Sequence, residues 1–138
     1  MAFSTTISVS TKGNADIIDI TDDVQKIITK QNLNSGIVNI FSPGSTGGVT
    51  TMEYEPGLIQ DMQNLFKKIA PTDIYYHHNE KWKDGNGHSH LRSALIGPSI
   101  SVPFEKGDLL LGTWQQIVFI DFDVRERKRK LIIQIIGE

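Results

Sequence analysis

The stretch Leu131-Ile132-Ile133-Gln134-Ile135-Ile136 decides the fold class, together with Ile117-Val118-Phe119-Ile120 before it. Both are rich in β-branched residues, which favour extended backbone. The earlier stretch belongs to a longer run, residues 108–122, that is apolar on both faces and therefore predicts a central strand. A turn near Asp123-Val124-Arg125 separates the two stretches, so we expect them to form an antiparallel pair.

Further strands and helices are expected upstream of this pair. Apolar residues alternate or cluster in four short runs, which predict strands at residues 3–10, 17–20, 37–41 and 49–54. We expect Asp22 to cap a first helix that ends before Asn34. Pro56 suits the first turn of a second helix, which ends at Pro71. Five apolar residues recur at helical spacing in this second helix and are expected in the core: Leu58, Met62, Leu65, Phe66 and Ile69.

These elements predict an α+β fold. We expect a single domain, residues 1–138, with a mainly antiparallel β-sheet or sandwich and two to three helices. The net charge of −2 argues against a dedicated nucleic-acid binder, which needs a basic excess. The absence of cysteine excludes disulfides and thiolate chemistry. No run approaches the roughly 18 apolar residues of a membrane span, and no signal-peptide pattern opens the chain, so we expect a cytoplasmic protein.

All four histidines lie within residues 77–90, among carboxylates, amides and glycines. Packing does not require such a composition, and histidine both titrates near neutral pH and binds metals. Leu91 and Leu95 share a helical face before the stop signal Gly97-Pro98, which favours a third helix opening near Gly87, with a strand as the alternative. His88 and His90 would diverge on a helix and point the same way on a strand.

A metal site is one interpretation of this segment. His78, His88 and His90 are the candidate ligands for a divalent ion, zinc or magnesium, because three imidazoles and a water form a common catalytic zinc arrangement. Asp84 or Glu80 would add an oxygen ligand or orient a histidine. A site for an anionic substrate is the second interpretation, and exposed histidines on a polar loop are the third.

Gly112-Thr113-Trp114-Gln115-Gln116 interrupts the apolar run before Ile117. On a strand, Thr113 and Gln115 would share one face, where Gln115 could hydrogen-bond a substrate beside Thr113. The alternative places Trp114 in the core and the glutamines at a sheet edge.

Two other segments have weaker signals. Pro43-Gly44-Ser45-Thr46-Gly47-Gly48 could bind an anion through backbone N–H groups and hydroxyls, or could simply be a turn. Arg125-Glu126-Arg127-Lys128-Arg129-Lys130 would place its three arginines on one strand face, where they could serve a phosphate. We favour the other reading of this run, a solvated hairpin that protects a sheet edge.

Taken together, these motifs resemble the YjbQ-like family of uncharacterised proteins. The resemblance extends over nearly the whole chain. It includes Tyr76-His77-His78-Asn79, Asp84-Gly85-Asn86-Gly87-His88-Ser89-His90, Gly112-Thr113-Trp114-Gln115, Asp121-Phe122-Asp123 and Arg127. It implies an α+β subunit that assembles as a homotrimer, with the histidine site near a subunit boundary. It also implies a proposed secondary thiamine-phosphate synthase activity, a transfer that joins a pyrimidine diphosphate to a thiazole phosphate and releases pyrophosphate.

We therefore expect an enzyme-like protein that acts on small phosphorylated molecules. The expected catalytic residues are His90, Gln115, Asp84 and Arg127, and the expected substrate-binding residues are Ser45, Thr46, Asn86 and Thr113. Many relatives have histidine where this chain has Gly44; if that histidine takes part in catalysis, the activity or the substrate differs here. The alternatives are a non-catalytic trimeric module that binds a metal or anion, and a metal-dependent hydrolase.

Overall fold

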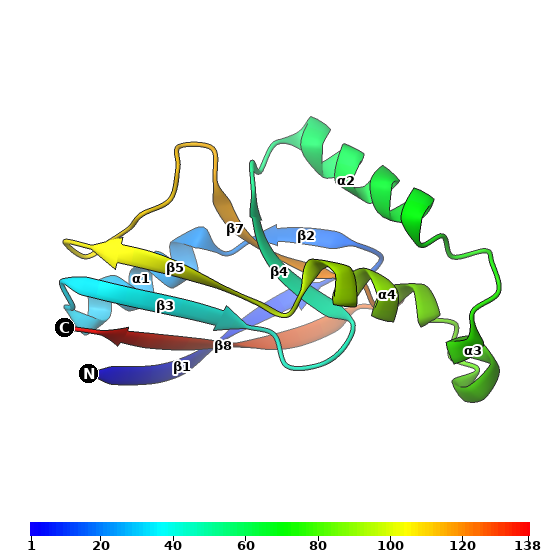
Figure 1. Ribbon diagram of the computed structural model, residues 1–138, viewed down its shortest axis with the longest axis horizontal. Coiled ribbons are helices and arrows are strands. Elements are labelled where there is room, and N and C mark those ends of the chain that lie inside the picture. Colours follow the sequence, from blue (N-terminus) through cyan, green and yellow to red (C-terminus); the bar gives the residue numbers. More distant parts are fainter.

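Two antiparallel sheets form the body of the molecule, whose computed structural model describes residues 1–138 (Figure 1). The first sheet contains, in spatial order, β1 (Ala2–Thr11), β8 (Arg127–Gly137), β3 (Ser35–Phe41), β5 (Ser99–Glu105) and β6 (Asp108–Leu109). The second contains β2 (Asp16–Asp19), β7 (Gln116–Asp121) and β4 (Gly47–Met52). The chain passes repeatedly from one sheet to the other, so segments distant in sequence meet at the ends of the strands.

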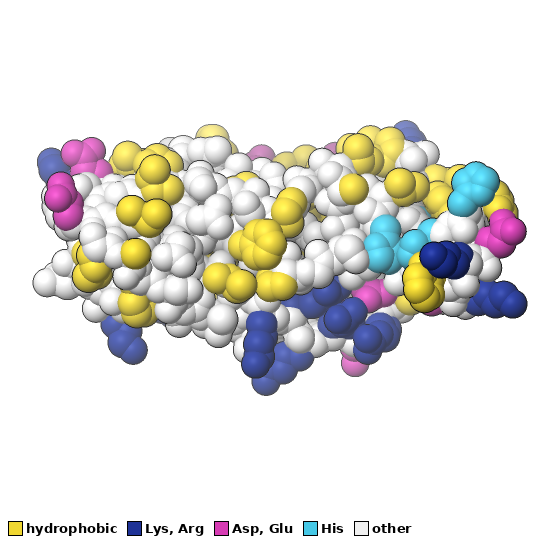
Figure 2. Space-filling view, turned by 60° about the horizontal axis from the view of Figure 1, so that its bottom comes forward, with side chains coloured by type: hydrophobic (Ala, Val, Ile, Leu, Met, Phe, Trp, Pro, Cys, Tyr) yellow, Lys and Arg dark blue, Asp and Glu magenta, His cyan; other side chains and the backbone are white.

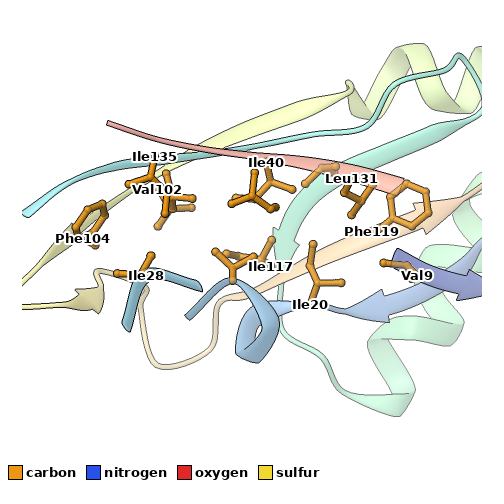
Figure 3. Packing of buried hydrophobic residues seen from close by; sticks show 14 residues of the cluster. Val9, Ile20, Ile28, Ile40, Val102, Phe104, Ile117, Phe119, Leu131 and Ile135 are labelled. Carbon is orange, nitrogen blue, oxygen red and sulfur yellow. The ribbon is translucent and has the colours of Figure 1, made fainter. Parts of the chain in front are cut away.

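The main core lies between the two sheets (Figure 3). On β7, Ile117 and Phe119 point into this core, whereas Val118 and Ile120 point to the opposite face. The first sheet contributes the inward residues of its own strands, among them Ile40, Val102 and Leu131, Ile133 and Ile135. β7 is thus buried on both faces, as its unbroken apolar sequence predicts.

Four helices surround the sheets: α1 (Thr21–Gln31), α2 (Pro56–Ile69), α3 (His77–Trp82) and α4 (Gly87–Ile96). Val24 and Ile28 of α1 complete the main core. α2 covers the outer face of the second sheet, where Phe66 packs edge-on against Phe122 at 4.8 Å between ring centroids. α3 and α4 lie at one end of the molecule (Figure 1). No helix is long and apolar enough to cross a membrane.

The predicted α+β fold with an antiparallel sandwich is confirmed, but the predicted pairing of the two C-terminal strands is wrong. β7 pairs with β2 and β4, whereas β8 pairs with β1 and β3, so the two strands face each other across the core. The single strand expected at residues 108–122 is also wrong. A turn closes at Gly112, whose carbonyl accepts from the Gln115 N–H (3.0 Å) and whose N–H donates to Gln115 Oε1 (2.8 Å).

The helix predictions are partly correct. The helix opening at Gly87 is confirmed, whereas α3 within the histidine segment was not expected. Asp22 is not the cap of α1: the helix begins at Thr21, and Asp19 accepts hydrogen bonds from the Thr21 N–H and hydroxyl.

In α2 only Phe66 is buried, whereas Leu65 is 46% and Ile69 51% exposed, so these two residues do not belong to the core. α2 covers a sheet on one side only, and its apolar stripe is wider than the face it buries.

Candidate functional site

The apolar core ends in a polar layer at the α4 end of the sandwich. Along β7 the inward positions are Ile117, Phe119 and then Asp121. Along β8 they are Arg127 and Arg129, followed by the apolar residues from Leu131 onward. Strand alternation therefore directs a carboxylate and two guanidinium groups into the space between the sheets, where apolar residues would otherwise continue the core.

Arg129 and Asp121 form the centre of this layer. Arg129 donates from Nε and Nη2 to the two carboxylate oxygens of Asp121, at 2.9 and 2.7 Å. The Thr11 hydroxyl donates to the same carboxylate at 2.6 Å, and Arg129 Nη2 also donates to the Thr46 hydroxyl at 2.7 Å. Burial raises the pKa of Asp121, but the hydrogen bonds from Arg129 and Thr11 outweigh it and hold the pKa below its usual range. The layer contains a charged pair that packing and hydrogen bonds fix in place.

Asp123, two residues beyond β7, connects this layer to the surface. Its carboxylate accepts a hydrogen bond from Arg127 Nη1 at 2.6 Å and one from the Thr46 hydroxyl at 3.4 Å. Burial raises the pKa of Asp123, and the bonds from the Val124 N–H and from Arg127 more than reverse this, so its pKa lies below the usual range. Asp123 is therefore a carboxylate at neutral pH, and it joins β8 to the glycine-rich loop between β3 and β4.

The N-terminal end of α4 meets the same carboxylate. The side chain of Asn86 lies between Asp123 and Asp84, and with its amide nitrogen turned toward Asp84 it donates to the two carboxylate oxygens of Asp84 at 2.8 and 3.1 Å. Further along, in the last turn of α4, the Ser93 hydroxyl donates to the Gly47 carbonyl at 2.5 Å. Gly87 is required at the helix start, because a Cβ would stand 2.8 Å from Cβ of Tyr76. These contacts place the first turn of α4 beside the glycine-rich loop.

His90 and His78 form a pair on the open side of this end. Their ring centroids are 4.3 Å apart, and His78 Nδ1 lies 3.6 Å from an Asp84 oxygen. Burial, and then the charge of His78, lower the pKa of His90, so its imidazole is mainly neutral at pH 7. A cavity of about 330 Å³ opens next to the pair and is lined by Tyr76, His77, His78, Gly87, His90 and Leu91. Figure 2 shows histidines at this end of the molecule, next to a group of lysines and arginines.

His88 lies apart from this pair. It is only 2% exposed, and its Nδ1 is buried without a hydrogen-bond partner. Burial and the nearby charge of Arg92 lower the pKa of His88, while Asp123 acts in the opposite direction. Because α4 is helical, His88 and His90 point in different directions, as expected for residues two apart on a helix.

The predicted metal ligands are therefore only partly brought together. His78 and His90 are adjacent, whereas His88 faces the interior. Glu80 accepts a hydrogen bond from the Tyr75 hydroxyl. No group of three or more histidine, aspartate or glutamate side chains has a spacing that would hold a metal ion.

The predicted substrate-binding residues fall into two groups. Thr46 and Asn86 lie in the site, and Ser45 is exposed on the loop beside Thr46. Thr113 and Gln115 lie on the turn between β6 and β7, well away from α3 and α4 (Figure 1). Gln115 donates to the Thr51 hydroxyl at 3.4 Å, and Trp114 beside it is 71% exposed. Within one subunit, this turn and the histidine pair are separate surfaces.

Sequence reasoning assigned no role to Asp121 or Asp123 and left Arg129 in a run interpreted as a solvated hairpin. That interpretation is wrong for Arg127 and Arg129, which point inward, and right for Lys128 and Lys130, which are exposed. The available signal was strand alternation: Asp121 continues the inward positions of Ile117 and Phe119, and Arg129 precedes those of Leu131 and Ile133.

Known proteins are similar to this chain in sequence. Residues 5–138 match the family described as UPF0047 protein YjbQ-like. The UPF0047 protein of Archaeoglobus fulgidus is 35% identical over 128 residues, 93% of this chain and 97% of that protein. UPF0047 protein YugU of Bacillus subtilis is 33% identical over 133 residues, 96% of this chain and 98% of that protein.

Solved structures agree with these matches. The crystal structure of a YbjQ-like protein of unknown function from Sulfolobus solfataricus superimposes with a TM-score of 0.94 at 32% identity, over 100% of this chain and 99% of that one. A YjbQ/UPF0047 family structure from Clostridium acetobutylicum gives a TM-score of 0.87 at 34% identity, over 96% and 99% of the two chains. The chain therefore belongs to the YjbQ-like UPF0047 family, whose known members include proteins of unknown function.

Proposed function

We propose that the polar end of the sandwich binds the phosphate group of a small phosphorylated molecule and acts on that molecule as an enzyme. One observation carries the proposal. Thr46 and Arg127 come from distant segments and both hydrogen-bond to the carboxylate of Asp123, whose negative charge also acts on His90 and raises its pKa. A hydroxyl, an imidazole and a guanidinium at one place are the groups that proteins use to bind phosphate and to move protons beside it.

Arg127 is the residue that would meet the phosphate. Its side chain is 30% exposed, and only its Nη1 is held by Asp123, so its other donors remain accessible. A guanidinium stays charged at any physiological pH and matches the geometry of phosphate oxygens. Arg127 would stabilise negative charge that develops on the phosphate during the reaction.

His90 would accept a proton during the reaction. A lowered pKa keeps its imidazole neutral, which is the form that a general base needs. His78 lies against it, and Asp84 lies 3.6 Å from His78, so a proton on either ring would be stabilised by a carboxylate. Asn86 would fix Asp84 and Asp123 relative to each other.

The cavity beside the histidine pair would hold the organic part of the substrate. Its volume of about 330 Å³ is at the lower end for small-molecule sites, roughly 300–1,000 Å³. Tyr76 and three histidines supply ring surfaces, which suits a flat heterocycle. A phosphorylated heterocycle is therefore the proposed substrate class, and thiamine-phosphate synthase-like transfer is the specific reaction to test.

A homotrimer would explain the separate position of Thr113 and Gln115. Trp114, next to Gln115, exposes 71% of its surface and is available to pack against a neighbouring subunit. If the turn that contains it docks on a neighbouring subunit, Gln115 can reach that subunit's histidine pair and orient the substrate. In this arrangement each site uses residues from two copies of the chain.

A divalent ion is a separate proposal. His78 and His90 would be its ligands, with an oxygen of Asp84, and this set is smaller than the three or four protein ligands of typical zinc sites. Elemental analysis of the purified protein tests the proposal, since a bound ion would be present at one per chain and would be lost from a His78→Ala variant.

The experiment for the proposed function measures binding and turnover together. Phosphate and phosphorylated pyrimidines and thiazoles are titrated into the protein, and product formation is followed. Arg127→Ala should abolish turnover, whereas Arg125→Ala, an exposed arginine of the same hairpin, should leave it intact. Binding without turnover on the whole panel would indicate a non-catalytic anion-binding module. Hydrolysis that chelator abolishes would indicate a metal-dependent hydrolase.

A further inference from the structure

Arg129 has one donor nitrogen without a partner. The residue is only 6% exposed, and the edge formed by Nε and Nη2 is used by Asp121 and Thr46. The third nitrogen, Nη1, makes no hydrogen bond with any protein atom, although it belongs to a charged group that is more than nine-tenths buried. Because the guanidinium is planar and Asp121 occupies one edge, Nη1 points away from that carboxylate.

The backbone above Nη1 is open because residue 44 is a glycine. Gly44 has φ +111°, a conformation that residues with a side chain rarely adopt. A Cβ built on Gly44 would stand 3.6 Å from Arg129 Nη1, and no other heavy atom outside the neighbouring residues lies within 4 Å of it. Gly44 itself is on the surface. The glycine thus leaves Nη1 open to solvent, although the Arg129 side chain as a whole is buried.

We propose that Arg129 Nη1 binds an oxygen of the ligand's phosphate group, which enters over Gly44, and that residue 44 controls access to this position. The inference rests on the proposed function, since it assigns a second contact to the same phosphate-binding site. Arg129 also donates to Thr46, whose hydroxyl reaches Asp123 at 3.4 Å, so the new position adjoins the one that Arg127 serves. Nη1 can make a short, charge-assisted hydrogen bond without breaking any existing contact of Arg129.

Two substitutions at residue 44 test the proposal. Gly44→Asp places a carboxylate next to Nη1, where it would pair with the guanidinium and exclude an anion. Gly44→Asn is the matched control, because it has the same size and a similar tolerance of positive φ but no charge. The affinity for inorganic phosphate is measured by calorimetry for both variants, with acetate as a second anion and thermal melting as a check of folding.

We expect Gly44→Asp to bind phosphate at least tenfold more weakly than Gly44→Asn, with acetate bound weakly by every form. Equal phosphate affinities for the two variants would overturn the proposal, and acetate binding as tight as phosphate binding would overturn its assignment to phosphate. Should neither variant fold, nitrogen-15 spectra of the wild-type arginine side chains decide the question: added phosphate must shift the Arg129 signals.

The same titration separates this inference from the proposed function. If His90→Ala weakens binding but the two residue-44 variants bind alike, the Arg129 position is refuted and the proposed function stands. If the residue-44 variants differ but His90→Ala binds normally, the Arg129 position stands and the role of His90 is refuted. A wild-type protein that binds no phosphate refutes both.

Discussion

Arg129 and Asp121 face each other across the sandwich, from β8 and β7, and are joined by two hydrogen bonds of 2.9 and 2.7 Å. The two strands belong to different sheets, so this ion pair joins the sheets at the end where the apolar core stops. Arg129 also fixes Thr46 on the glycine-rich loop, so the same pair that closes the core positions part of the candidate site.

Removing one member of this pair should destabilise the protein strongly. Arg129→Ala leaves the carboxylate of Asp121 buried without its main partner, at an expected cost of about 3–5 kcal/mol in the free energy of unfolding. Lys130 is the exposed neighbour of Arg129, and Lys130→Ala should change the free energy of unfolding by less than about 0.5 kcal/mol. Urea unfolding measures both, and similar values for the two variants would contradict the structural role of Arg129.

Acid should weaken the contact between Asp123 and Arg127. The pKa of Asp123 is lowered in the folded protein, so its contribution to stability is complete above the unfolded pKa of about 3.9 and is lost as the pH falls through the lower folded value. Between neutral pH and pH 3, wild type should therefore lose more stability than Asp123→Asn. If the unfolding free energies of both proteins had the same pH dependence, folding would not lower the pKa of Asp123.

Residues of the histidine segment should differ in their effect on phosphate binding. His90→Ala should weaken phosphate binding by about ten- to a hundredfold, the range expected for one hydrogen bond to a charged group. Lys81→Ala is the control, since Lys81 is an exposed residue of α3 that does not line the cavity beside the histidine pair. Calorimetric titration compares them, and equal losses would assign the effect to general disturbance of α3.

Neighbouring residues of α2 should have very different effects on stability. Phe66 is 1% exposed and packs from α2 against the second sheet. Phe66→Ala should therefore lower the free energy of unfolding by about 3–5 kcal/mol. Leu65 is largely exposed, so Leu65→Ala should cost less than about 1 kcal/mol. A large loss of stability for Leu65→Ala that grows on dilution would show instead that the face of α2 carrying Leu65 is buried in an assembly.

Subunit sharing predicts complementation between two inactive variants. If Gln115 acts on a neighbour's histidine pair, His90→Ala and Gln115→Ala should each lack turnover, and mixed oligomers should regain part of it. Refolding an equimolar mixture and measuring turnover tests this. Mixed oligomers that stay inactive would place Gln115 outside the site, and a monomeric mass in solution would exclude the arrangement altogether.

Local sequence patterns were enough to predict most of the elements. The alternation of residues 3–10 predicted β1, and the breakers Pro56 and Pro71 bounded α2 closely. What local patterns could not provide was the partner of each strand. The runs containing Ile117 and Leu131 are neighbours in sequence and equally apolar, but whether they pair or face each other depends on β1, β2, β3 and β4, which lie far away in the chain.

The candidate site was predictable where its chemistry was concentrated in sequence. The histidine segment was singled out because all four histidines of the chain cluster there, and Thr46, Asn86 and Arg127, also expected in the site, lie at the polar end of the sandwich. Asp121 and Arg129 were assigned no role because single charged residues within apolar strands reveal their burial only when the register of both sheets is known. Thr113 and Gln115 were expected in the same site as His90, and the turn at Gly112 places them on a separate surface of the chain.

Phosphate is proposed to bind at the end of the sandwich that carries Arg127, Arg129 and His90. Titrating inorganic phosphate into nitrogen-15-labelled protein tests it most directly. The account predicts saturable shifts confined to the glycine-rich loop at residues 43–48, the first turn of α4 and the start of β8. Shifts centred on the turn at residues 110–115, or no shifts at millimolar phosphate, would contradict it.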